Sequence, residues 1–288
     1  MIPHRFEYHA PHSLPDAISL LGQYGDEAKL LAGGHSLLPM MKLRFAQPGH
    51  LIDLGKIQDL KGIREEGGEI RIGAMTTENE LIWSELLQQK CPLLVETARV
   101  ISDPQVRYMG TLGGDISHGD PGNDHPAVML ALDARFVLQG PNGERIVAAQ
   151  DFFLGTYYTA LEPTEILTEI RIPTPAAGTG YCYSKLKRKT GDFATAAAAV
   201  LLRMRGNIVD HVSIALTNLA PTAIKAGEAE AALLGKELDD KAIKQAASLA
   251  MSVCEPAADL RGDIEYKTAM AGVMTERALR TAYSRATR

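Results

Sequence analysis

The stretch that decides the fold is Leu31-Ala-Gly-Gly-His-Ser-Leu-Leu-Pro-Met-Met-Lys42. The apolar run 29–32 predicts a short strand, the pair Gly33-Gly34 predicts a turn, and Ser36 predicts the N-cap of a helix. Paired glycines permit positive φ, and a turn of this kind exposes unpaired backbone amides. Because Gly33 and Gly34 carry no side chain, these amides can approach phosphate oxygens closely. The alternative is a tight connection in which the glycines serve only the backbone geometry.

A second glycine pair lies in the segment Gly110-Thr-Leu-Gly-Gly-Asp-Ile116. The sequence around it does not repeat the sequence around the first pair. Two such turns in unrelated surroundings predict two walls of one elongated pocket. A dinucleotide suits this pocket, because its diphosphate has oxygens on two sides and each wall can offer amides to one side.

These two segments also carry a family resemblance. Ala-Gly-Gly-His-Ser-Leu-Leu-Pro at 32–39 and Thr-Leu-Gly-Gly-Asp at 111–115 resemble the two FAD diphosphate motifs in the flavoprotein (medium) subunits of molybdenum hydroxylases, the xanthine dehydrogenase family. The resemblance continues through 170–173, 185–189 and 270–274, so it covers essentially the whole chain. Within the family, the chain is most similar to the medium subunits of aerobic carbon monoxide dehydrogenases.

Prolines and glycines between 173 and 180 form the clearest linker in the sequence. We therefore expect two domains, residues 1–177 and 178–288, with the first divided into subdomains of about 1–56 and 57–177. The expected fold class is α+β. The resemblance implies an FAD-binding domain of the vanillyl-alcohol-oxidase (PCMH) type, followed by a small sheet backed by helices as in carbon monoxide dehydrogenase flavoproteins.

Hydrophobic periodicity and turn residues predict the elements of both domains. Strands are expected at 50–54, 69–72, 136–138, 146–148, 166–172, 181–186, 194–204 and 208–216, and helices after Ser13, after Thr77, from Pro92, and within 225–252 and 266–286. Residues 101–114 are predicted to form an irregular functional loop. Residues 151–153 are expected to belong to the strand-rich part of the first domain.

The resemblance implies one FAD on this chain. The positions expected to contact it are Ala32, Gly33, Gly34, His35, Ser36, Leu37, Thr111, Leu112, Gly113, Gly114, Asp115, Asp124, Leu167, Lys187 and Phe193. We expect noncovalent binding, because no histidine or cysteine stands in an obvious flavin-linking context. His35, inside the first glycine turn, would lie far from the ring methyl that such links use.

Asp115 and Asp124 belong to a run rich in aspartate and histidine, 115–126. We interpret the run as a polar loop that binds ribose and adenine. A metal site is the alternative, although these residues are scattered over a Gly/Pro-rich turn and lack the tight spacing of metal ligands. By resemblance, Asp124 lies near the adenosine half of FAD, and Asp115 stands where many family members have asparagine. Because a carboxylate beside a diphosphate is unfavourable, we expect the backbone amide of Asp115 to matter more than its side chain.

The basic segment Lys185-Leu-Lys-Arg-Lys-Thr-Gly-Asp-Phe193 joins two expected strands. Composition alone allows a solvated hairpin. The other hypothesis is that a lysine reaches the flavin, where a cation near the N1 and O2 edge would stabilise the reduced anion. The resemblance favours this second hypothesis, with Lys187 at the position of the flavin-proximal lysine and Phe193 on a loop that shields the isoalloxazine ring.

Composition narrows the class of protein. A chain of 288 residues with 45% hydrophobic content can bury a large core, and its net charge of −5 makes nucleic acid a poor partner. Its 3 cysteines, which show no CxxC spacing, fit neither an iron–sulfur nor a structural zinc pattern on this chain. Neither a signal peptide nor a membrane-spanning run is apparent, so we expect a cytoplasmic protein.

These features favour an electron-transfer flavoprotein subunit without a catalytic acid, base or nucleophile of its own. The resemblance implies a heterotrimer, usually doubled, with a large molybdopterin subunit and a small subunit that carries [2Fe-2S] clusters. Electrons would pass from the clusters to FAD and on to an acceptor such as a quinone, in the cytoplasm or at the inner face of the membrane. Carbon monoxide is the expected substrate of the large subunit, with an aldehyde or N-heterocycle as the alternative. A self-sufficient flavin oxidase and a scaffold that has lost its flavin are the other hypotheses.

Overall fold

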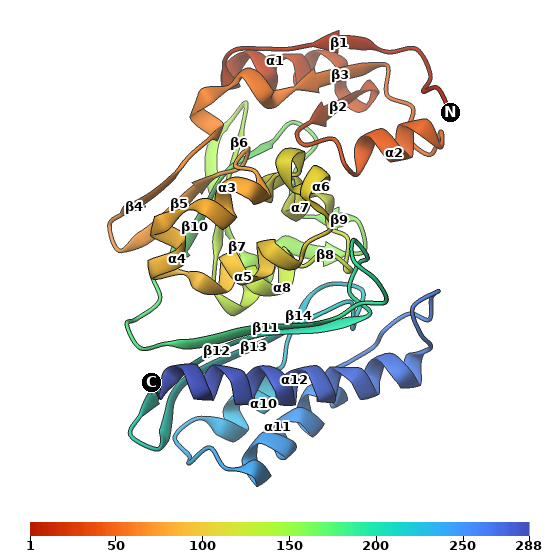
Figure 1. Ribbon diagram of the computed structural model, residues 1–288. Helices are drawn as coiled ribbons and strands as arrows, with labels where there is room; N and C mark the ends of the chain where they lie inside the picture. The colour runs from red at the N-terminus through yellow and green to blue at the C-terminus, as the bar shows by residue number, and fades with distance from the viewer. Residues whose placement is uncertain (288) are drawn as a thin grey trace.

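Three main β-sheets follow one another along the chain in the computed structural model, which describes residues 1–287. The middle one has five strands. Figure 1 shows the N-terminal sheet at the top, this sheet in the middle and the C-terminal sheet below, each flanked by helices. This mixture of helices and sheets confirms the expected α+β class. Within residues 1–287, no helix has the length and apolar character needed to cross a membrane.

The N-terminal sheet is parallel and has the strand order β1-β3-β2. It comprises β1 (Glu7–His9), β2 (Ala28–Leu31) and β3 (His50–Asp53), connected by α1 (Leu14–Tyr24) and α2 (Leu37–Lys42). The predicted succession of strand, glycine segment and helix is therefore confirmed. The first glycine segment lies where the chain leaves β2 and enters α2.

Local sequence signals determine α1. The Ser13 hydroxyl accepts a hydrogen bond from the amide of Asp16 at 3.2 Å, and Gly25 ends the helix with φ 52. Leu21 of α1 and Ile52 of β3 belong to the same buried cluster. The helix thus covers one face of the N-terminal sheet and fixes the strands that position the glycine segment.

The middle sheet is antiparallel, with the strand order β4-β5-β10-β6-β7. Its strands are β4 (Ile63–Glu66), β5 (Glu69–Gly73), β6 (Arg135–Gly140), β7 (Gly143–Ala148) and β10 (Ile166–Pro173). A two-stranded ribbon follows α9 (Ala149–Phe152) and consists of β8 (Phe153–Gly155) and β9 (Tyr158–Thr159). Six helices lie between β5 and β6: α3 (Glu78–Trp83), α4 (Glu85–Lys90), α5 (Pro92–Val100), α6 (Pro104–Met109), α7 (Leu112–His118) and α8 (His125–Ala131).

The C-terminal sheet is an antiparallel meander with the order β11-β12-β13-β14. Its strands are β11 (Gly180–Leu186), β12 (Ala196–Arg205), β13 (Ile208–Thr217) and β14 (Ile224–Lys225), followed by α10 (Gly227–Leu233), α11 (Asp240–Ser252) and α12 (Ile264–Ala286). The expected sheet backed by helices is present, and α12 runs along one face of it (Figure 1).

The C-terminal sheet is buried on both faces. Ala197 and Ala199 of β12 belong to the same core cluster as the helices of the first domain, whereas Ala198 and Val200 pack with α10, α11 and α12. This alternation is what a strand produces when each face meets a different layer. The two predicted domains therefore share a continuous core, and the boundary at 177 stays a prediction.

Two local predictions are wrong. Residues 104–109 form α6 instead of an irregular loop, because Asp103 caps the helix by accepting from the amide of Val106 at 3.0 Å and Pro104 fits its first position. Residues 151 and 152 end the short helix α9 rather than a strand.

Candidate functional site

The first glycine segment is an open stretch of backbone between β2 and α2. Among residues 1–287, the amides of residues 33–37 donate to no backbone acceptor, whereas the amide of Leu38 donates to the carbonyl of Gly34 at 3.0 Å. Gly34 has φ 78, a conformation that favours glycine. Ser36 holds the N-cap position of α2, but its side chain makes no capping hydrogen bond. Consecutive unpaired donors of this kind are what a phosphate-binding backbone offers.

The second glycine pair is helical. Gly113 and Gly114 lie in the first turn of α7, and neither has a positive φ. The Thr111 hydroxyl accepts from the amide of Gly114 at 3.2 Å, and the amide of Gly113 donates to the carbonyl of Ala74 at 2.9 Å. The amide of Asp115 donates to the carbonyl of Thr111 at 3.0 Å. The prediction of an open turn here is wrong, and the amide of Asp115 already has a partner within the helix.

The two glycine segments nevertheless lie against each other. A Cβ atom built on Gly33 would stand 2.2 Å from the carbonyl oxygen of Met109, which immediately precedes the second segment. A Cβ atom built on Gly114 would stand 3.7 Å from the Cβ of Ala32. The absence of side chains at these glycines allows the two stretches to approach, and they lie side by side as the walls of one site would.

Leu112, within the second segment, and Leu167 of β10 are buried, with exposed fractions of 0% and 4%. Ala74 links this segment to the middle sheet, because its carbonyl accepts from Gly113 and its amide donates to the carbonyl of Thr168 at 2.9 Å. Leu112 and Leu167 are therefore core residues that help fix the start of α7.

The run 115–126 is divided between the end of α7, a short turn and the start of α8. Asp120 organises the turn by accepting from the amide of Gly122 at 2.8 Å. Asn123 donates to the backbone carbonyl of Asp115 at 2.9 Å, which ties the turn to α7. The polar side chains thus hold the local backbone, and the expectation that the whole run is a loop is wrong for its two helical ends.

A buried ion pair connects the two predicted domains. Lys185 of β11 donates to one carboxylate oxygen of Asp124 at 2.6 Å, and the Tyr183 hydroxyl donates to the other at 2.5 Å. The exposed fractions of the Lys185 and Asp124 side chains are 3% and 6%. Burial and the neighbouring Asp124 raise the pKa of Tyr183 well above its usual value. Both oxygens of Asp124 are bonded internally, so its side chain has a structural role beside whatever contact it makes with a ligand.

A second buried group links α3, α7 and α8. His125 Nε2 and a Glu78 carboxylate oxygen lie 2.8 Å apart, and both side chains are almost fully buried. Burial alone would lower the pKa of His125, but Glu78 and then Asp115 raise it to about 9. Burial raises the pKa of Asp115 to about 7, opposed by the charge of His125. One oxygen of Asp115 and Nδ1 of His125 are buried without a hydrogen-bond partner among residues 1–287.

The raised pKa of Asp115 predicts a pH-dependent effect of replacing it. The pKa of this carboxyl is about 7 in the folded chain, against 3.8 for the ordinary group in the unfolded chain. Because the folded state holds the proton more tightly, the fold loses stability as the pH rises from 3.8 to 7, and the whole loss is present above pH 7. Asp115→Asn removes this ionisation and should raise the unfolding temperature by several °C at pH 8, with a smaller rise at pH 5. Thermal unfolding scans at both pH values measure the effect, with the exposed Asp151→Asn as the control. Destabilisation of Asp115→Asn at pH 8 would contradict the assignment.

Three cations gather near the end of α5. Lys187 donates to the carbonyl of Val100 at 3.2 Å, and Lys185 reaches the same carbonyl at 3.4 Å. Burial and then the charge of Lys185 lower the pKa of Lys187, Asp124 opposes this effect, and Arg107 lowers the pKa to a smaller extent. A cation whose charged form is disfavoured by neighbouring cations is stabilised by an anion, so this corner suits a negatively charged ligand.

Phe193 is 45% exposed and lines a cavity of about 420 Å³ that residues of both predicted domains form. The guanidinium of Arg261 lies 5.4 Å from the centre of its ring and also pairs with Asp192 at 2.8 Å. Burial would raise the pKa of Asp192, but hydrogen bonds from Arg261 and Arg188 lower it to about 2. The loop that carries Phe193 is therefore held by ion pairs while its aromatic ring stays accessible.

Sequence reasoning missed Glu78 and Tyr183, although the capping residue Thr77 places Glu78 in the first turn of α3. Their partners, His125 and Asp124, lie 47 and 59 positions away in the sequence, and contacts at that separation leave no local pattern. His125 and Arg107 lie in the stretches 115–126 and 101–114, which the sequence analysis singled out without giving either residue a partner.

Two family models match the chain. One, described as the FAD binding domain in molybdopterin dehydrogenase, matches residues 4–175. The other, described as the CO dehydrogenase flavoprotein C-terminal domain, matches residues 181–282. Together they cover both glycine segments and the C-terminal sheet with its helices.

Known proteins match over the full length of the chain. It is 61% identical over 285 residues to the carbon monoxide dehydrogenase medium chain of Hydrogenophaga pseudoflava and 55% identical over 286 residues to that of Afipia carboxidovorans, with 99% of each chain covered. The glyceraldehyde dehydrogenase medium chain of Sulfolobus acidocaldarius is 34% identical over 280 residues, which cover 97% of this chain and 99% of the relative. A solved structure of carbon monoxide dehydrogenase from Hydrogenophaga pseudoflava matches with a TM-score of 0.98 and 64% identity over 99% of both chains.

Proposed function

This chain belongs to the family of FAD-binding medium chains of molybdenum hydroxylases, and we propose that it is the medium chain of an aerobic carbon monoxide dehydrogenase. The observation that carries the proposal is the difference in sequence identity between relatives that act on different substrates. Two carbon monoxide dehydrogenase medium chains are 61% and 55% identical to it, whereas a relative named for an aldehyde substrate is 34% identical over a similar length. Carbon monoxide is therefore favoured over an aldehyde or N-heterocycle as the substrate of the complex.

The backbone around the first glycine segment fits FAD. The unpaired amides of residues 33–37 would hold the diphosphate from one side. The second glycine segment would form the opposite wall of the site. When bound, FAD supplies one- and two-electron redox chemistry. The chain contributes binding, orientation and charge, which is what an electron-transfer subunit requires.

The cations near Val100 would supply the charge. Lys185 is neutralised by Asp124, whereas no carboxylate pairs with Lys187 within residues 1–287, and Arg107 adds to the positive potential. This excess positive charge would stabilise negative charge that develops on a bound cofactor during reduction. Phe193, accessible on a loop anchored by Asp192, would cover an aromatic ring of the cofactor.

The buried charged groups of this region pair with one another. Glu78 pairs with His125, and Asp124 pairs with Lys185, each away from solvent. Because these four side chains are buried and paired, the region favours electron transfer over substrate oxidation by this chain alone. The self-sufficient oxidase is therefore the weaker hypothesis.

We further infer that this chain works in a complex with a large molybdopterin subunit and a small iron–sulfur subunit, assembled as a dimer of heterotrimers. Molybdopterin and iron–sulfur clusters belong to the partner subunits in this family. Large apolar side chains that stand exposed on the isolated chain support partner surfaces, among them Phe45 at 81%, Trp83 at 70% and Tyr108 at 65%. The family resemblance also favours a cytoplasmic complex, either free or bound peripherally at the inner face of the membrane.

Noncovalent binding of one FAD per chain is the expected result for the purified complex. The ring of His35 turns back onto its own segment, where Nδ1 lies 2.9 Å from the carbonyl oxygen of Gly33. Acid precipitation should therefore release all the flavin into the supernatant, where its absorbance gives one FAD per medium chain. A yellow protein pellet would contradict noncovalent binding.

The substrate of the complex needs a separate measurement. If an aldehyde or N-heterocycle, and not carbon monoxide, reduces the iron–sulfur clusters and bleaches their visible absorbance, the complex has another substrate.

A further inference from the structure

A group of possible metal ligands lies at the edge of the N-terminal sheet opposite the glycine segment. His50, the first residue of β3, pairs with Ala28, the first residue of β2, whereas the glycine segment follows Leu31, the last residue of β2. In the parallel sheet these two positions lie at opposite ends of the strands. The group is thus separate from the backbone that would hold FAD.

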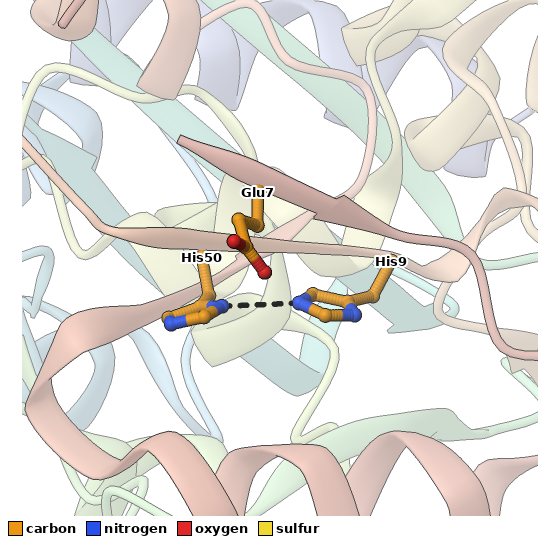
Figure 2. A group of neighbouring side chains, drawn as sticks. All are labelled: Glu7, His9 and His50. Carbon is orange, nitrogen blue, oxygen red and sulfur yellow. Dashed lines mark hydrogen bonds between the residues drawn. The ribbon is translucent and has the colours of Figure 1, made fainter. Parts of the chain in front are cut away.

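The strand register brings three donors to one face of this edge. Glu7 of β1 is the partner of His50 in β3, and His9 follows Glu7 by two residues, so its side chain points to the same face. Figure 2 shows the Glu7 carboxylate pointing toward the gap between the two imidazole rings. The donor atoms of the three side chains all lie within 4.8 Å of one another.

The imidazole rings are already held in place by their surroundings. The ring of Tyr24, at the end of α1, stacks on His50 with centroids 3.7 Å apart and an angle of 10° between the planes. It also stacks on His9 at 5.1 Å and 28°. Ligands fixed in this way lose little freedom when they bind an ion.

The distances within the group suit a small tetrahedral cation. Nε2 of His9 and Nδ1 of His50 lie 3.0 Å apart. Two imidazoles bound to a tetrahedral ion at 2.0–2.1 Å have their nitrogens about 3.3 Å apart, so a movement of a few tenths of an ångström would admit the ion. The Glu7 carboxylate forms no ion pair within residues 1–287. A single hydrogen bond between the histidines leaves this converging carboxylate without a partner, whereas an ion would engage all three side chains.

We propose that Glu7, His9 and His50 form a binding site for a divalent transition-metal ion, and that Zn²⁺ is the ion that fits it best. Two imidazoles and one carboxylate are common ligands of zinc, and water would complete the tetrahedron. Mg²⁺ and Ca²⁺ prefer oxygen ligands and should not compete. The bound ion would fasten the three-residue strand β1 to β3 and thereby stabilise the subdomain that carries the glycine segment.

Zinc binding to the untagged full-length chain tests the proposal, with a chromophoric chelator as competitor. We expect one equivalent of Zn²⁺ bound with micromolar or tighter affinity, unaffected by excess Mg²⁺. His9→Gln and His50→Gln should each weaken binding by at least about 100-fold and Glu7→Gln by about 10-fold, since a direct ligand matters at least as much as its outer partners. The exposed neighbour His12→Gln is the matched control and should bind as the unaltered chain does. Weaker than micromolar binding, or equal losses in the His12 and His50 variants, would overturn the site.

A measurement on the unaltered chain keeps the test valid if a variant folds poorly. Zn²⁺ should protect His9 and His50, and not His12, from acylation by diethyl pyrocarbonate, as mapped by peptide mass spectrometry. Equal acylation of His9 and His50 with and without Zn²⁺ would show that the two rings are only hydrogen-bonded to each other.

Discussion

Gly33→Val should abolish retention of FAD, with a fall of at least about tenfold in flavin per medium chain in the purified complex. The cause is crowding between the two glycine segments. A Cβ atom at position 33 would stand 2.2 Å from the carbonyl oxygen of Met109 and 2.7 Å from the Cα of Gly110, both far below van der Waals contact. Both neighbours are backbone atoms that cannot rotate away, so the segments must separate and the unpaired amides lose their position. The flavin absorbance of the purified complex measures the outcome.

Backbone strain is not the reason for this expectation. Neither Gly33 nor Gly114 has a positive φ, so a β-branched residue is excluded there by contact and not by conformation. The matched control is Gly22→Ala, because a Cβ atom at Gly22 in α1 meets nothing within 4 Å and alanine favours a helix by about 1 kcal/mol. A folded Gly33→Val complex with normal flavin content would show that the first segment is only a connector. Gly33→Ala, with a smaller side chain and the same Cβ contact, replaces it if the valine variant does not assemble.

Lys185→Met should lower the unfolding temperature of the chain by roughly 10 °C. Removing one partner of a buried ion pair typically destabilises by about 3–5 kcal/mol, because the other charge is left buried and unpaired. Asp124 would be that charge, since its side chain is 6% exposed and Lys185 is its only cationic partner within residues 1–287. Thermal unfolding followed by circular dichroism measures the effect. The pair joins β11 to the loop before α8, so its loss should loosen the contact between the two predicted domains.

Lys187→Met supplies the comparison within the same basic segment. Lys187 is partly exposed and bonds only to the carbonyl of Val100, so we expect a change within about 1 kcal/mol. The double variant Lys185→Met/Asp124→Asn should recover part of the lost stability, because it removes the unpaired charge. Equal effects of the two single lysine variants would contradict the account of the buried pair.

The parts of the fold that the sequence predicted are those with local signals. Ser13 and Gly25 at the ends of α1, and Thr77 before α3, place hydrogen-bonding groups within a few residues of the amides they cap. Runs of apolar residues likewise identified β10 and β12, and the run in β12 is continuous because both faces of that strand are buried. The first glycine segment was correctly predicted to leave amides unpaired, because the strand before it ends and the helix after it has not begun.

The second glycine segment shows where such reasoning failed. Gly113 and Gly114 were expected to form a turn because they are a second Gly-Gly pair among small and hydroxyl-bearing residues. The cap from Thr111 and the close contact of Gly113 with Ala74, whose Cβ would lie 2.5 Å from a Cβ at position 113, explain why glycine is found in this helix. Ala74 and Gly113 are 39 positions apart, and a contact at that separation leaves no local pattern. The same holds for Glu7 and His50, which only the pairing of β1 with β3 brings together.

Electron flow in a flavin-free complex tests most directly that this chain is an electron-transfer subunit. After FAD is removed and the partner subunits are retained, carbon monoxide should still bleach the visible absorbance of the iron–sulfur clusters at a rate close to that of the complete complex. Transfer to an external acceptor such as a quinone should fall to near zero and return when FAD is added back. Clusters that are reduced by carbon monoxide only when FAD is bound would contradict this account, because substrate oxidation would then depend on this chain.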